Sequence, residues 1–376
     1  MSATILKRIV IHVPTLRGGG AERVCVLVAN EFSRRGHDVI LFVWDATGPN
    51  AALVSPQVKI VDLGYRAHGE NFGKLTTLKA FFRSIAAYRR MKPDAVFSAL
   101  EFANLLTALA IIFGRTKAAF FPSFHAAGSL KADSLGSRFA PLFSRIVGRR
   151  STRAIAVSRG IAEDLETRGF VRERISVIGN PIPALQIGQP PHGAWHGRLS
   201  AMGTGPVLVT LGRLVEVKDH RTLIEAFSKL DPARNCRLVI FGEGPLRDML
   251  VQQAEALGVA DRILFAGYIN DPAACYAVAD LFVLSSRSEG FGNVLVEAMG
   301  MGVPVVSTDA PHGPREILAD GRYGALVPVG DAEALAASIE KTLDHPPSVS
   351  ILHERARDFG ERVIGDSYEA LLNLPR

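Results

Sequence analysis

The chain has 376 residues, 48% of them hydrophobic, so it exceeds the usual size of one domain and has enough apolar side chains for two cores. Its three cysteines, Cys25, Cys236 and Cys275, are far apart, which excludes a CxxC zinc pair, argues against a disulfide framework and predicts a reducing cytoplasmic compartment. The longest uncharged apolar stretch, 102–114, is about five residues or more shorter than a bilayer span, so no membrane-crossing segment is predicted. The apolar run 9–13 near the start is too short for a secretory signal.

The formal net charge of +6 conceals an asymmetry between the two halves of the chain. Residues 1–184 carry 26 Lys and Arg against 13 Asp and Glu, a net charge of +13, whereas residues 185–376 carry 17 against 24, a net charge of −7. This distribution predicts that the N-terminal half meets an anionic partner, which would be a lipid surface, a lipid-linked diphosphate or a nucleic acid.

Strand and helix patterns alternate along the first half of the chain. It opens with a strand at 8–13, a glycine loop at 17–20 and an amphipathic helix at 21–35 that Gly36 ends. Further strands are predicted at 38–44, 58–62, 95–98, 118–121, 154–157 and 175–178. Apolar strands that alternate with helices are typical of a parallel sheet covered on both faces and joined by right-handed crossovers.

The same architecture is predicted a second time after a segment rich in Pro and Gly. We expect an N-terminal domain at 1–184, a linker at 185–205 and a C-terminal domain at 206–352, with a helix at about 353–376 that packs back on the first domain. The strands of the second domain are predicted at 207–211, 237–241, 263–266, 281–284, 303–307 and 325–327. The predicted fold class is therefore α/β, with two Rossmann-like doubly wound domains facing a central cleft at the carboxyl ends of their strands.

The strongest motif follows the 281–284 strand, where a glycine loop leads into a helix. It reads Ser285-Ser286-Arg287-Ser288-Glu289-Gly290-Phe291-Gly292-Asn293, and the helix after it contains Glu297. The unpaired N–H groups and the positive dipole end at such a helix start suit a phosphate group. Glu289 and Glu297 would then reach different parts of one ligand, such as a sugar and a ribose. In the alternative interpretation, Glu289 caps the helix and Glu297 lies on a solvated face.

A second motif, Gly212-Arg213 followed by Lys218, comes after the 207–211 strand. The forked guanidinium of Arg213 and the compact charge of Lys218 can neutralise a diphosphate leaving group without a metal. The alternative is that both are solvated surface cations.

With these motifs, the sequence resembles the retaining glycosyltransferases of family 4, which have the GT-B fold, over essentially its whole length. The pair Glu289 and Glu297, eight residues apart with Gly-Phe-Gly between them, is specific for this family when it occurs together with the other motifs. A lone glycine loop would be a weak match. The other matching motifs are Gly19-Gly20-Ala21-Glu22, Val157-Ser158, Asn180-Pro181, Gly212-Arg213 with Lys218, and Gly242-Glu243-Gly244-Pro245-Leu246.

The resemblance implies that the N-terminal domain binds the acceptor and that the C-terminal domain binds the donor, and it implies a role for each matching residue. Arg213 and Lys218 would bind the donor diphosphate, Glu297 the ribose hydroxyls and Glu289 the transferred sugar. Gly19 and Gly20 would let the N-terminal loop close over the diphosphate. His125 matches the family's cleft histidine near the sugar, although without the resemblance a structural histidine would be favoured. The remaining donor-binding residues implied are Gly290, Phe291, Gly292, Asn293 and Val294, and the catalytic candidates are His125, Glu289, Arg213 and Lys218.

The chemistry that the resemblance implies differs from that of a retaining glycosidase, which needs two carboxylates about 5 Å apart. The acceptor hydroxyl would attack from the face that the diphosphate leaves, so the enzyme would mainly position the reactants and stabilise the leaving group. No Asp-x-Asp motif occurs in the chain, and we expect no metal and no cofactor. The expected donor is a UDP-linked hexose or N-acetylhexosamine, with GDP-mannose as the main alternative.

The segment 309–317 resembles the branch of the family that builds bacterial surface glycans, so a glycan or polyprenyl-diphosphate-linked acceptor is expected. Arg315 in this segment would touch the donor or, equally, serve as a cation at a helix start. Two basic amphipathic stretches, 74–92 and 134–150, predict peripheral attachment to the inner face of the cell membrane through anionic lipid. The alternative for each stretch is a core helix with a solvated basic face.

Three other functions compete with this interpretation. A nicotinamide-dependent dehydrogenase would need G-x-G-x-x-G in the first loop, which Arg17-Gly18-Gly19-Gly20-Ala21-Glu22 does not fit. A nucleic-acid-binding protein would explain the basic half, but no recognised module or aromatic platform accompanies the charge, so no nucleic-acid partner is expected. A sugar-nucleotide epimerase of the same fold is the nearest alternative.

Overall fold

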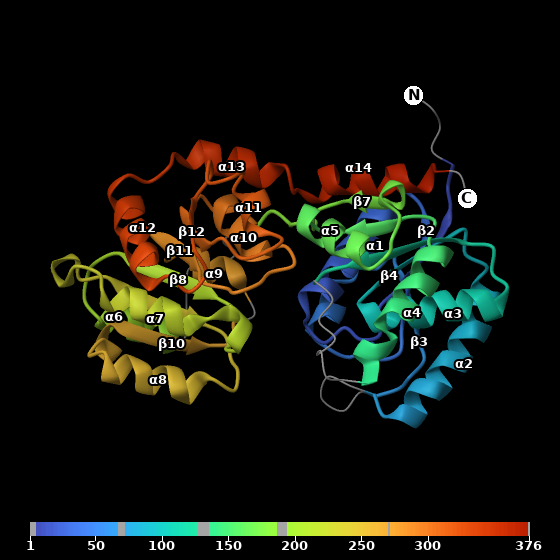
Figure 1. Ribbon diagram of the computed structural model, residues 1–376, viewed down its shortest axis with the longest axis horizontal. Coiled ribbons are helices and arrows are strands. Elements are labelled where there is room, and N and C mark those ends of the chain that lie inside the picture. The colour runs from blue at the N-terminus through green and yellow to red at the C-terminus, as the bar shows by residue number, and fades with distance from the viewer. Residues whose placement is uncertain (1–4, 67–71, 127–134, 186–193, 270, 375–376) are drawn as a thin grey trace. The chain divides into compact units, whose positions relative to one another are not determined.

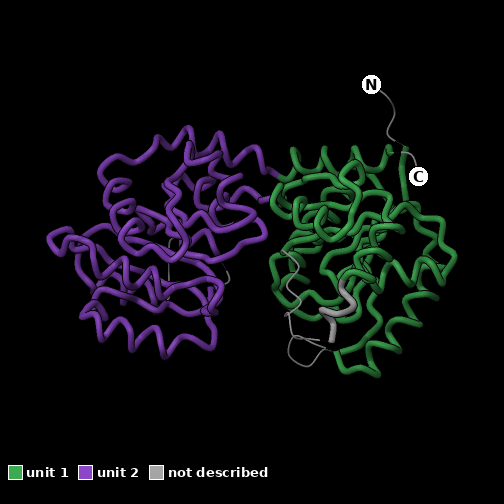
Figure 2. The backbone as a smooth tube through the Cα atoms, in the orientation of Figure 1, with its two compact units in different colours: residues 1–181, 361–376 green, residues 182–360 purple. Residues whose placement is uncertain are grey.

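The computed structural model describes residues 5–66, 72–126, 135–185, 194–269 and 271–374. The chain forms two compact units, which Figure 2 shows in different colours. Unit 1 contains residues 1–181 and 361–376, and unit 2 contains residues 182–360. Each unit is built around its own parallel sheet.

Unit 1 contains a seven-stranded parallel sheet in the order β3-β2-β1-β4-β5-β6-β7. Apolar and β-branched runs form its central strands, which are buried on both faces as is usual where helices cover a parallel sheet. The strands are β1 (Arg8–His12), β2 (Asp38–Val43), β3 (Lys59–Asp62), β4 (Ala95–Ala99), β5 (Ala119–Phe124), β6 (Ala154–Ala156) and β7 (Ile175–Val177).

The helices of unit 1 include the last helix of the chain (Figure 1). Tyr368 and Leu371 of that helix join the core cluster around Phe32 and Phe97. Arg35 also forms an ion pair with Asp366, at 2.7 Å. The helices are α1 (Gly20–Arg34), α2 (Lys74–Met91), α3 (Glu101–Gly114), α4 (Leu135–Arg150), α5 (Arg159–Thr167) and α14 (Glu361–Leu372).

Unit 2 contains a six-stranded parallel sheet in the order β10-β9-β8-β11-β12-β13. Its strands are β8 (Val207–Leu211), β9 (Arg237–Phe241), β10 (Ile263–Gly267), β11 (Leu281–Leu284), β12 (Val305–Thr308) and β13 (Ala325–Val327). Its helices are α6 (Ala194–Ala201), α7 (His220–Ser228), α8 (Arg247–Ala256), α9 (Pro272–Tyr276), α10 (Asn293–Gly300), α11 (Pro314–Ile317), α12 (Ala332–Asp344) and α13 (Val349–Arg357).

Two segments differ from the expected organisation. The helical pattern expected over 353–376 is divided, because α13 ends at Arg357 and packs on α10 within unit 2, whereas α14 packs on α1 within unit 1. Within the expected linker at 185–205, residues 186–193 lie outside the described residues, and Ala194–Ala201 forms helix α6 of unit 2.

Each sheet has one switch point, which is the place where the chain connections on its two sides leave in opposite directions. In unit 1 this point lies between β1 and β4, and in unit 2 it lies between β8 and β11. Doubly wound sheets bind their ligands beyond the carboxyl ends of the two strands at such a point. The loops that follow β1, β8 and β11 therefore hold the residues of greatest functional interest.

Candidate functional site

The glycine loop of unit 1 connects β1 to the amino end of α1. Gly18 has a φ of 103°, a conformation that glycine adopts without strain. The carboxylate of Glu22 accepts a hydrogen bond from the Gly19 amide at 3.0 Å and another from the Thr15 hydroxyl. Glu22 thereby fixes the loop to the first turn of α1 and holds Gly19 and Gly20 at the carboxyl edge of the sheet.

His125 follows β5, the second strand from the switch point of unit 1. Its Nε2 lies 3.0 Å from the Ser123 hydroxyl, which donates to the Ser98 carbonyl oxygen, so Nε2 is the nitrogen that carries the proton. Burial lowers the pKa of His125 to about 4, so the ring is neutral at neutral pH. Nδ1 is buried and has no hydrogen-bond partner among the described residues, which leaves an acceptor suited to a ligand hydroxyl.

In unit 2, the loops after β8 and β11 are fastened together at the switch point. The guanidinium Nε of Arg287 donates to the buried carboxylate of Asp219 at 2.9 Å, and the Arg287 amide donates to the Val217 carbonyl at 2.8 Å. The Ser285 hydroxyl donates to the Lys218 carbonyl at 3.0 Å. Asp219 also caps α7 through the Thr222 amide. These contacts give the two loops a common, fixed geometry.

The two motifs identified in the sequence meet at this junction. The Lys218 ammonium lies 2.5 Å from Glu289 Oε1, and the same oxygen accepts the Ser286 hydroxyl at 2.6 Å. Their side chains are 23% and 11% exposed, so the ion pair is largely shielded from water but open on one side. Neither residue is a freely solvated charge, and Glu289 does not cap α10, whose cap residue is Gly292.

Helix α10 begins at Asn293, directly after Gly292, which has a φ of 104°. Its N-cap residue, Gly292, has no side chain that could cap the helix, and the amino end of a helix is suited to an anion such as a phosphate. Glu297 is only 5% exposed and accepts the Tyr276 hydroxyl at 2.9 Å. The alternative that Glu297 lies on a solvated face is therefore wrong.

Two close backbone contacts support these loops. A Cβ atom on Gly313 would lie 1.7 Å from the Phe291 carbonyl oxygen, so the segment before α11 packs directly on the 290–292 loop. A Cβ atom on Gly242 would lie 1.9 Å from the Gly212 carbonyl oxygen, where the loop after β9 supports the loop that carries Arg213. Only glycine permits these approaches.

Models of two families match the chain. The family described as "Glycosyltransferase Family 4" matches residues 18–184, and that described as "Glycosyl transferases group 1" matches residues 194–362. A lipopolysaccharide core biosynthesis glycosyltransferase of Rhizobium meliloti, LpsE, is 31% identical over 96% of this chain and 98% of its own length. The chain belongs to the family 4 glycosyltransferases. Its predicted place in the surface-glycan branch is also confirmed.

Further comparisons agree with this assignment of the transferase. A Campylobacter jejuni N-acetylgalactosaminyltransferase, whose name gives a diphospho-undecaprenol-linked acceptor, is 25% identical over 90% of this chain and 91% of its own length. The structure of Anabaena HepE in complex with UDP and glucose superposes with a TM-score of 0.77 at 22% identity, covering 98% of this chain and 100% of that one. The predicted GT-B fold of two Rossmann-like domains is confirmed.

Arg213 and Arg315 occupy different environments in the transferase. Arg213 is exposed in the loop after β8, the same loop that carries Lys218. Arg315 pairs with Asp309 and, at 3.2 Å, with Asp320, so carboxylates already neutralise its charge. This pairing favours a structural role for Arg315, in which it fastens the ends of the 309–320 segment.

Sequence reasoning missed the residues that hold the site together. Asp219 and Arg287 lie beside the recognised motifs, but nothing in their spacing shows that they pair. Glu22 belongs to a recognised motif, and the three-residue spacing from Gly19 to an acidic residue is the signal of a helix start that could have identified its role. In the described part of the transferase, no group of three or more His, Cys, Asp or Glu side chains is placed to hold a metal ion.

Proposed function

We propose that the transferase is a retaining, metal-independent enzyme that moves a hexose or N-acetylhexosamine from a nucleotide diphosphate sugar to a glycan or lipid-linked acceptor in bacterial surface-glycan synthesis. The observation that carries this proposal is the meeting of Lys218, Glu289 and the amino end of α10 at the switch point of the unit 2 sheet. A cation and a helix terminus at one place form a site for a diphosphate, with a carboxylate beside it for the sugar.

In this proposal the donor diphosphate binds Lys218 and Arg213 and the amides of the 290–294 loop. Glu289 accepts hydrogen bonds from hydroxyls of the transferred sugar, and Glu297, oriented by Tyr276, accepts those of the ribose. As the glycosidic bond breaks, negative charge develops on the diphosphate, where the ammonium of Lys218 and the helix dipole stabilise it. These two features supply the positive charge for which other transferases use a divalent ion.

Retention of configuration follows in this proposal from attack on the face that the diphosphate leaves. The acceptor hydroxyl bonds to the anomeric carbon while the bond to the diphosphate oxygen breaks, and that oxygen takes the proton of the hydroxyl. In this proposal Lys218 and Ser286 hold Oε1 of Glu289, and its carboxylate accepts hydrogen bonds from the sugar and does not attack the anomeric carbon. His125 is neutral and offers Nδ1 as an acceptor for a sugar hydroxyl.

The relatives support the choice of substrates. HepE was solved with UDP and glucose, which favours a UDP-hexose as the donor, with GDP-mannose as the alternative. The Campylobacter relative is named for a polyprenol diphosphate-linked acceptor, which supports an acceptor of that class.

A thermal-shift screen over nucleotide sugars in excess EDTA tests this proposal. The matching donor at about 100 times its Kd stabilises the folded protein by about 2.7 kcal/mol, which is roughly 5 °C or more in Tm. The same donor should yield a product with the donor's anomeric configuration, detected by NMR, only when an acceptor is present. Loss of activity in EDTA with recovery in manganese would reject metal independence. Turnover of the nucleotide sugar without an acceptor would favour the epimerase.

We also propose that unit 1 attaches to an anionic membrane surface. Three apolar side chains of α2, Leu75, Leu78 and Phe82, are 65%, 52% and 61% exposed, and they recur at helical spacing beside the cations Lys74 and Lys79. Such a face suits the interface of a bilayer that contains anionic lipid. No helix among the described residues is long and apolar enough to cross a membrane.

Co-sedimentation with vesicles at low salt measures this attachment. The wild-type protein should sediment with vesicles that contain phosphatidylglycerol and remain in the supernatant with phosphatidylcholine alone. Leu78→Ser together with Phe82→Ser should reduce the bound fraction severalfold, because these changes replace two of the three exposed apolar side chains of α2. Equal binding of the two proteins would reject α2 as the contact.

A further inference from the structure

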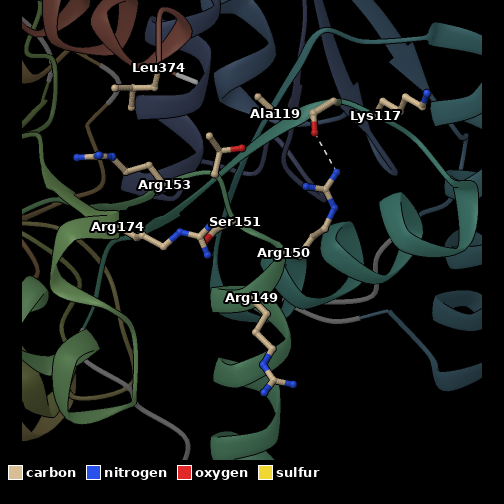
Figure 3. Close-up of a pocket in the computed structure, with 10 residues that line it drawn as sticks. Lys117, Ala119, Arg149, Arg150, Ser151, Arg153, Arg174 and Leu374 are labelled. Carbon is tan, nitrogen blue, oxygen red and sulfur yellow. Dashed lines mark hydrogen bonds between the residues drawn. The ribbon is translucent and has the colours of Figure 1, made fainter. Parts of the chain in front are cut away.

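The amino edge of the unit 1 sheet, opposite the edge that carries Gly19 and His125, contains a hollow. Its volume is about 480 Å³, within the range of pockets that hold small molecules. It opens where β5, β6 and β7 begin and where α4 ends (Figure 3). The function proposed above uses none of the residues that line it.

The lining of this hollow is strongly cationic. Five of its residues are basic, and none of the lining residues in the described part of the chain is Asp or Glu. They come from three neighbouring strand starts and one helix end. The five are Lys117, Arg149, Arg150, Arg153 and Arg174.

The helix dipole accounts for only part of this charge. Arg149 and Arg150 lie in the last turn of α4, where a cation stabilises the carbonyl end of the helix. Arg153 and Arg174 lie instead one position before the paired residues Ala154 and Ile175 of β6 and β7. Figure 3 shows both side chains at the same hollow. Two cations at adjacent strand starts, with no Asp or Glu among the lining residues that the structure describes, favour an anion in the hollow.

Two of the guanidinium groups are also partly cut off from water. Arg150 donates to the carbonyl oxygens of Thr116 at 3.2 Å and Ala118 at 2.9 Å, and burial lowers its pKa. Arg153 Nε is buried without a hydrogen-bond partner among the described residues. Partial burial of a cation raises the free energy of the folded state, and an anion in the hollow would offset part of that cost.

The floor of the hollow is already formed. The Phe120 amide donates to the Thr152 hydroxyl at 3.0 Å, and the Thr152 amide donates to the Phe120 carbonyl at 2.8 Å. Ser151 donates through its hydroxyl to the Gly148 carbonyl at 2.9 Å. A ligand would therefore bind arginine side chains that a fixed backbone already positions, which lowers the entropic cost of binding.

We propose that this hollow is an anion site for a phosphate-bearing ligand, bound by Arg153 and Arg174 with Arg149 and Lys117 at its rim. The planar fork of arginine matches phosphate oxygens, and several forks in one hollow favour a phosphate over a single carboxylate. The phosphate belongs either to a soluble metabolite or to a lipid headgroup. The site is independent of the proposed donor site, which lies in unit 2.

A local measurement distinguishes this site from the donor site, because pyrophosphate would bind both. Phenylglyoxal modifies accessible arginines, and mass spectrometry reports each position. Inorganic pyrophosphate should slow the modification of Arg153 and Arg174 about tenfold and leave the modification of the exposed Arg362 of α14 unchanged. Protection by phosphatidylglycerol vesicles in place of pyrophosphate would support the site and identify its ligand as a lipid headgroup. Equal modification rates with and without both probes would overturn the proposal.

Paired variants provide the second measurement, by calorimetric titration with pyrophosphate. Arg153→Gln with Arg174→Gln should weaken one binding event by about tenfold or more, since two charge-assisted contacts are lost. Arg115→Gln with Arg362→Gln removes the same charge from exposed positions of the same unit and should leave that event intact. Equal weakening in both double variants would show that only the net charge matters, and would overturn the proposal.

Discussion

Replacing Lys218 with alanine should lower kcat/KM for the donor by about 10²–10³-fold. The change removes a cation from the proposed leaving group and leaves the shielded Glu289 carboxylate without its partner. Removing one group that stabilises developing charge in other enzymes costs about 2.7–4 kcal/mol of transition-state stabilisation. Steady-state kinetics with the donor found in the screen measure the effect. Lys218→Arg keeps the charge and should retain more activity than Lys218→Ala.

Two controls separate this role from a general effect of charge. Lys341→Ala removes an exposed cation of α12 in the same unit and should leave kcat/KM within about twofold. Because Lys218 and Glu289 contact each other, the double variant Lys218→Ala with Glu289→Gln should lose less activity than the sum of the two single losses predicts. A Lys218→Ala enzyme within about threefold of the wild type would remove Lys218 from the proposed mechanism.

Replacing Gly313 with alanine should raise KM for the donor by about tenfold or more. The new methyl group would lie 1.7 Å from the Phe291 carbonyl oxygen, so the 290–292 loop or the segment before α11 must move. Forcing an added methyl group into packed structure typically costs about 1–3 kcal/mol. Donor titration followed by thermal shift measures the loss of binding, and circular dichroism checks that the fold persists.

Gly197→Ala is the matched control for this variant. Gly197 lies in α6 of the same unit, and a Cβ atom there would meet nothing within 4 Å. Alanine favours a helix over glycine by about 1 kcal/mol, so this variant should be as stable as the wild type or more stable, with unchanged donor binding. An unchanged KM in Gly313→Ala would mean that the position of the 290–292 loop does not govern donor binding.

The sequence predicted the strands of both units well, because each is a short apolar run between helices. The predicted bounds of β8, β9, β11 and β13 are those of the structure, and those of β5 and β12 differ by up to three residues. The break between α13 and α14 was missed. Apolar residues continue at helical spacing through 353–374, and periodicity alone does not show that Leu352 packs in one unit and Tyr368 in the other.

The candidate site was predicted as a set of residues but not as an arrangement. Lys218 and Glu289 each stood out because they follow a strand and precede a helix. Their contact joins residues 71 positions apart, and it depends on β8 and β11 being neighbours in the sheet. Strand order is a property of the whole fold, which local patterns do not contain. The pairing of Arg315 with Asp309, six residues apart, depends on the conformation of the segment that joins them, which residue patterns also do not specify.

The position of α14 affects how the protein folds while it is being synthesised on the ribosome. Residues 361–372 complete the core around Phe32 and Phe97, yet they are translated after all of unit 2. Unit 2 is contiguous in sequence, so its core can form before synthesis ends. The core of unit 1 stays incomplete until α14 has been synthesised, although most of unit 1 is made earlier. A truncation shortly before residue 361 should therefore expose apolar side chains of unit 1 and leave the core of unit 2 complete.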